Sequence, residues 1–76
     1  MKTETQTETN LETLSQSVQT TKRDVERSKI LFANKLATYD DMAAAAKLFS
    51  NALYNYQRAK YPAMKVKRMA YQIILR

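Results

Sequence analysis

The chain has 76 residues, a formal net charge of +6, and no cysteine, histidine or glycine. This length allows one small domain. Without cysteine, neither a disulfide nor a thiolate zinc site can stabilise its core. The same omissions remove the commonest general base, the strongest side-chain nucleophile and any glycine-rich phosphate loop. We therefore expect a protein that is not an enzyme, needs no cofactor or metal, and is stabilised as a homodimer or by its partner.

The longest uninterrupted apolar run, Met42 to Ala46, has five residues. A spanning helix needs roughly 20 apolar residues, so the sequence predicts neither a membrane span nor a signal peptide. A soluble, cytoplasmic protein is the expectation that follows.

The first ten residues alternate threonine with charged and amide residues and contain only Met1 as apolar material. Such a segment buries too little apolar surface to offset the entropy of ordering, so residues 1–10 are predicted to form a disordered tail. Beyond the tail, apolar residues recur at intervals of three, four and seven, which predicts a helix from about residue 11 to 37. These residues are Leu11, Leu14, Val18, Val25 and Phe32.

The stretch TYDD, Thr38 to Asp41, has the spacing of a capping box and places two carboxylates where a helix N-terminus favours negative charge. It predicts a second helix over about 39–60, which Pro62 ends. Apolar residues at intervals of three and four give this helix the strongest stripe in the chain. They are Met42, Ala45, Ala46, Phe49, Ala52, Leu53, Tyr56 and Ala59.

The last segment supports two interpretations, a helix over about 63–75 or a strand from Arg68 onward. The helix is favoured because no other strand is available for pairing, and a strand exchanged within a dimer is the alternative. The inward stripe of the helix would be Pro62, Val66, Met69, Ala70 and Ile73. The predicted fold class is thus all-α: a single helical domain over 11–76, made of a long helical hairpin and a short basic C-terminal helix, behind the disordered tail.

The charges are unevenly distributed along the chain. Residues 1–21 carry one basic and three acidic residues, whereas residues 22–76 carry twelve basic and four acidic ones. Seven basic residues and no acid follow Asp41, an asymmetry that favours a polyanionic partner. The residues predicted to bind this partner are Arg58, Lys60, Lys65, Lys67, Arg68, Tyr71 and Arg76. In a helix over 63–75, Met64, Tyr71 and Leu75 would form a second, smaller apolar line, and Met64 and Leu75 together with Tyr71 would be the apolar anchors if the partner is a protein.

Nucleic acid is the narrowly preferred partner, because the absence of acids over the last 35 residues exceeds what the rim of a protein interface requires. Contact would be mainly to the phosphate backbone, and the neighbouring tyrosines could bond phosphates or stack on unpaired bases. The alternative is a small inhibitor or adaptor that docks its basic amphipathic C-terminal segment on an acidic face of a larger enzyme or assembly. An anionic membrane is least favoured, because the basic segment lacks a broad apolar face.

Overall fold

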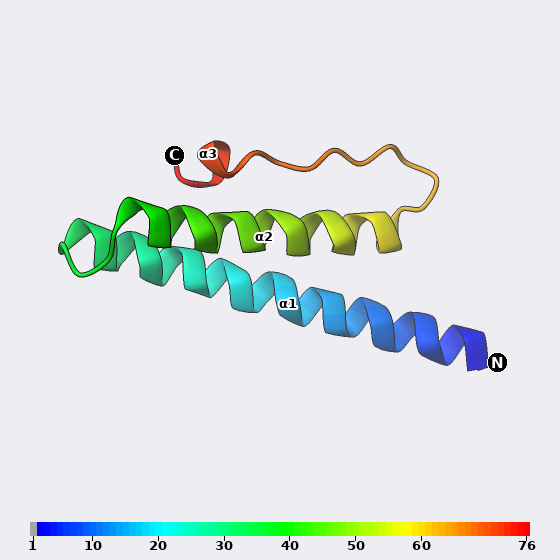
Figure 1. The fold of residues 1–76 in the computed structure, drawn as a ribbon. Coiled ribbons are helices and arrows are strands. Elements are labelled where there is room, and N and C mark those ends of the chain that lie inside the picture. Colours follow the sequence, from blue (N-terminus) through cyan, green and yellow to red (C-terminus); the bar gives the residue numbers. More distant parts are fainter. Residues whose placement is uncertain (1) are drawn as a thin grey trace.

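The computed structural model describes the backbone of residues 2–76 and the side chains of residues 10–76. It contains two long helices, α1 (Lys2–Ala33) and α2 (Tyr39–Lys60), and one short helix, α3 (Tyr71–Ile74). The two long helices pack as an antiparallel hairpin, and the chain then returns along another side of α2 (Figure 1). The all-α prediction is confirmed, and the described residues form no strand.

Helix α2 begins and ends where the sequence predicts. The Thr38 hydroxyl accepts a hydrogen bond from the Asp41 backbone N–H at 3.1 Å, and the Asp41 carboxylate accepts one from the Thr38 N–H at 3.1 Å. This capping box satisfies backbone donors that have no partner within the helix. Asp40 in the first turn and Arg58 and Lys60 in the last turn lie where the helix dipole favours each charge.

Helix α1 ends at Ala33 rather than near residue 37, in a Schellman turn. The Leu36 N–H donates to the Leu31 carbonyl at 2.8 Å, and the Lys35 N–H donates to the Phe32 carbonyl at 3.0 Å. Lys35 adopts the left-handed conformation with φ of 62°, a position that glycine usually occupies. Apolar periodicity gives no signal for this ending, because the turn is made by backbone hydrogen bonds around a lysine.

Lys35→Gly should raise the free energy of unfolding by about 1 kcal/mol, because the left-handed region costs a residue with a Cβ roughly 1–2 kcal/mol. Urea unfolding followed by circular dichroism measures the change. Lys35→Ala removes the same charge but keeps the Cβ, so it should give no such stabilisation. Equal stabilisation by both substitutions would show that the backbone conformation is not the cause.

Helix α1 starts at Lys2, whereas the apolar pattern predicts a start near residue 11. The intervening segment contains neither glycine nor proline, so nothing in it stops a helix once the following turns have formed. Met1 and the side chains of residues 2–9 lie outside the described residues. The disordered tail over 1–10 stays a prediction.

The predicted helix over 63–75 is wrong for most of its length. Residues 61–70 form a turn followed by an extended run, and helix is confined to Tyr71–Ile74. A short helix is marginal without tertiary contacts, and the closely spaced basic residues of this segment have no acid to pair with. The Ser50 hydroxyl instead donates to the Met69 carbonyl, which holds the extended backbone against α2.

The core is small and is centred on α2. Among residues 10–76 the buried apolar residues are Val25 of α1 and Met42, Ala43 and Ala46 of α2, and of these only Ala46 is fully enclosed, at 0% exposure. The chain measures 51 × 22 × 13 Å along its principal axes. This flat shape keeps most side chains close to a surface, so few of them can be buried completely.

The inward stripe predicted for the last segment requires a helix and is not formed. Its members are half-buried or exposed: Val66 is half-buried, and Pro62, Met69, Ala70 and Ile73 are exposed. At the hairpin turn, the exposed rings of Phe32 and Tyr39 pack edge to face with their centroids 6.1 Å apart. A second copy of the chain would cover apolar surface of this kind, and the homodimer stays a prediction.

Candidate polyanion-binding face

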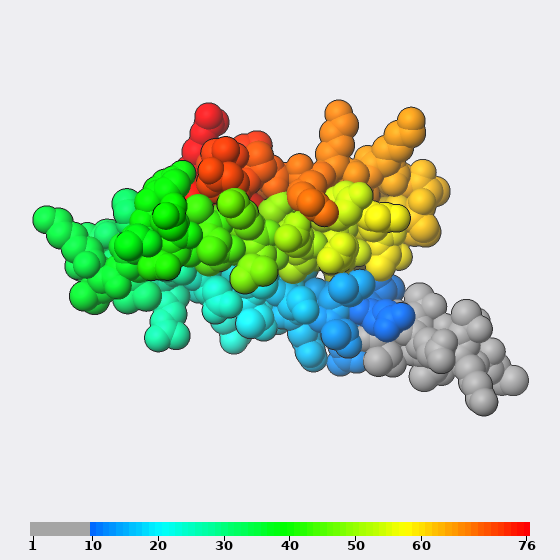
Figure 2. All heavy atoms as spheres, in the orientation of Figure 1, coloured from blue at the N-terminus to red at the C-terminus, as the bar shows by residue number. Residues whose placement is uncertain are grey.

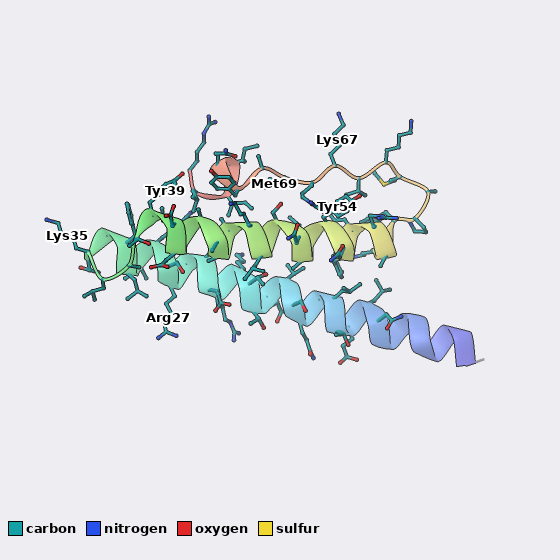
Figure 3. The ribbon with its side chains drawn as sticks, viewed as in Figure 1. Arg27, Lys35, Tyr39, Tyr54, Lys67 and Met69 are labelled. Carbon is teal, nitrogen blue, oxygen red and sulfur yellow. The ribbon has the colours of Figure 1, made fainter. Side chains whose placement is uncertain are left out.

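The end of α2 and the returning segment carry a surface that we call the basic face. Its members are six exposed basic residues: Arg58, Lys60, Lys65, Lys67, Arg68 and Arg76. Long side chains stand out from the returning segment in Figure 2, and Figure 3 shows Lys67 pointing away from α2. No carboxylate side chain follows Asp41 in the sequence, so neither the rest of α2 nor the returning segment contains an acidic side chain that could neutralise this charge.

Two arginines of the basic face meet at one tyrosine. The guanidinium carbon of Arg58 lies 5.6 Å from the ring centroid of Tyr54, and that of Arg68 lies 4.9 Å from it. Arg58 follows Tyr54 by one turn of α2, whereas Arg68 comes from the returning segment, so the ring links the two elements (Figure 3). A carboxylate partner would neutralise a guanidinium and occupy its N–H donors. A neutral ring does not, so the positive charge and the donors stay available to another anion.

Two lysines also lie over tyrosine rings. Lys60 Nζ lies 5.5 Å from the ring centroid of Tyr56 and 5.6 Å from that of Tyr61. A side-chain hydrogen bond to Tyr56 and the electrostatic effect of Tyr56 and Tyr61 raise the pKa of Lys60 above its ordinary value. Lys47 Nζ lies 5.1 Å from the ring centroid of Tyr71. These tyrosines therefore hold cations in place.

The predicted apolar anchors do not lie on one line. Met64 is 64% exposed in the turn that follows α2. Tyr71 and Leu75 are half-buried, in α3 and directly after it, and Figure 1 shows α3 beside the first half of α2. Their alignment requires a helix through residues 63–75, and most of that segment is extended. The described chain thus presents no long amphipathic helix at its C-terminal end.

A cleft that sequence reasoning missed opens between α2 and the returning segment, with a volume of about 340 Å³. The residues that line it are Lys47, Ser50, Asn51, Arg68, Met69, Ala70, Tyr71 and Gln72. The residues from α2 gave no signal in the sequence, because polar side chains between apolar positions are typical of a solvent-facing helix surface. They line a cleft only because residues 61–70 run extended beside them.

Tyr54→Leu should loosen the returning segment, because it removes the ring that two guanidinium groups contact. We expect trypsin to cleave after Lys65, Lys67 and Arg68 several-fold faster, since each exposed cation–π contact contributes about 0.5–1 kcal/mol. Timed digestion followed by mass spectrometry measures these rates. Tyr39→Leu, which removes a ring at the hairpin turn, is the control and should leave them unchanged. Equal rates in the wild type and in Tyr54→Leu would show that Tyr54 does not hold the segment.

Comparisons with protein families, with curated proteins and with solved structures found no match to this chain. Each helix in the described part of the chain is too short or too polar to span a lipid bilayer. What the chain binds must therefore be inferred from its own geometry and charge.

Proposed function

We propose that the protein is a non-enzymatic, regulatory binding protein whose basic face contacts nucleic acid, mainly through the phosphate backbone. The observation that carries this proposal is the cluster at Tyr54. There Arg58 and Arg68 contact one ring, in a part of the chain without acidic side chains. Two like charges held near each other repel, and an anion placed beside them lowers that energy. Phosphate oxygens also match the planar N–H donors of guanidinium groups.

The returning segment extends this site in one direction. Lys65 and Lys67 are exposed and lie two residues apart in a run that Figure 1 shows as extended. In an extended chain such residues leave the backbone on the same side, with their Cα atoms about 6.6 Å apart. A row of cations with a short repeat suits a polymer of phosphates better than it suits a single anion.

Direct titration tests the proposal. Increasing protein is added to a labelled duplex and to the matching single strand at about 50 mM salt, where phosphate contacts are strong. We expect saturable binding to at least one of the two nucleic acids, with little binding to anionic vesicles at the same salt. Absence of binding to both nucleic acids would overturn the proposal and direct the search to proteins with an acidic surface.

The protein-partner alternative has less structural support. It predicts an amphipathic C-terminal helix that docks on an acidic face, with Met64, Tyr71 and Leu75 as anchors. That helix is restricted to Tyr71–Ile74, and Met64 lies outside it, in the turn that follows α2. An inhibitor or adaptor role stays a prediction, and affinity capture with and without nuclease distinguishes it from nucleic-acid binding.

A further inference from the structure

The cleft between α2 and the returning segment adds hydrogen-bonding groups to the basic face. Its volume of about 340 Å³ is at the lower end of the range for small-ligand sites. Lys47 and Arg68 supply two cations to it, and none of its lining residues, all of which the structure describes, is acidic. Asn51 reaches it from α2, and Gln72 reaches it from α3. The cleft thus combines positive charge with two side-chain amides.

Some polar groups of the cleft are already engaged, and others are open to a ligand. The Ser50 hydroxyl donates to the Met69 carbonyl, and the two cations lie over tyrosine rings. Within residues 10–76, no hydrogen bond engages the side-chain amides of Asn51 and Gln72. Each amide offers two donors and one carbonyl acceptor, the groups that pair with the edge of a nucleic-acid base.

We infer that this cleft receives one unpaired nucleotide of a single-stranded nucleic acid. The two amides bond the base edge, and Lys47 and Arg68 contact the phosphates on either side of it. Bases of an intact duplex are stacked and paired, so they cannot enter a cleft of this size. The inference rests on the proposed function and deepens it: the basic face contacts the phosphates of either form of nucleic acid, and the cleft adds contacts that only a strand with unpaired bases can make.

The double variant Asn51→Ala with Gln72→Ala tests the inference, because both residues are exposed and neither belongs to the basic face. We expect affinity for a single strand to fall about 10-fold, the scale of one lost pair of hydrogen bonds to a base edge, while affinity for the duplex is unchanged. Asn55→Ala, which removes an exposed amide of α2 outside the cleft, is the matched control and should change neither affinity. Titration of labelled strands at one fixed salt concentration measures all four affinities.

The outcomes separate this inference from the proposed function. A single-strand affinity equal to that of the wild type would overturn the role of the cleft and leave the basic face intact. Failure of the wild-type protein to bind either nucleic acid would overturn both. If circular dichroism shows that the double variant has lost helix, the two single substitutions take its place, with an expected fall of several-fold each.

A competition experiment distinguishes a base-binding cleft from a site for phosphate alone. Excess mononucleotide should displace the single strand, whereas inorganic phosphate at the same ionic strength should displace it much less, because it offers no base edge to the two amides. Equal displacement by the two competitors would overturn base recognition in the cleft.

Discussion

Replacing Lys65, Lys67 and Arg68 together by glutamate should abolish nucleic-acid binding while leaving helix content unchanged. These residues supply half of the six basic residues of the basic face. Each phosphate contact releases counterions, and losing three contacts should lower affinity on the order of 500-fold at about 0.1 M salt. The three new carboxylates also repel the phosphates. Fluorescence anisotropy with a labelled strand measures the affinity, and circular dichroism checks the fold.

The matched control reverses three basic residues on another part of the molecule. Arg23, Arg27 and Lys35 are exposed on α1 and the hairpin turn, and Figure 3 shows Arg27 and Lys35 pointing away from the hairpin. Their replacement by glutamate changes the net charge by the same amount. Because salt screens distant charges, we expect this variant to lose less than about 10-fold in affinity. Equal losses in the two triple variants would show that net charge, and not the basic face, determines binding.

The second large effect concerns stability. Ala46→Leu should lower the free energy of unfolding by about 1–3 kcal/mol, because Ala46 is fully enclosed and three extra carbons have no space there. A chain of this size has only about 4–11 kcal/mol of stability in total, so the loss is a large share of it. In urea denaturation, the urea concentration at the midpoint of unfolding should fall, whereas the slope of the free energy of unfolding against urea concentration should stay unchanged.

Ala44→Leu is the control for this packing effect. Ala44 is exposed on the same helix, and the substitution is chemically identical, so both variants change helix propensity equally. We expect its free energy of unfolding to stay within about 0.5 kcal/mol of the wild type. A comparable loss at both positions would contradict the enclosed packing of Ala46.

Helix α2 could be predicted with its bounds because several local signals agree. The capping box at Thr38 fixes its start, an apolar stripe runs along it, and Pro62 follows its end. Each of these signals lies within a few residues of the feature that it determines. The all-α class follows from the same local information, since the chain contains no glycine and one proline.

The path of the last segment could not be predicted, because distant contacts determine it. Met69 is held by Ser50, which lies 19 residues earlier in the chain, and Arg68 is held over the ring of Tyr54. Periodicity within the segment carries no information about these partners. The cleft was missed for the same reason, since Asn51 joins Gln72 only when the chain turns back along α2.

The central claim is that the basic face contacts a row of phosphates, and the salt dependence of affinity tests it most directly. Six contacts predict that the logarithm of the binding constant for a duplex falls with the logarithm of salt concentration at a slope of about −5. Affinity should then decrease on the order of 1000-fold between about 50 and 200 mM salt. A slope near zero for both the duplex and the single strand would contradict the claim.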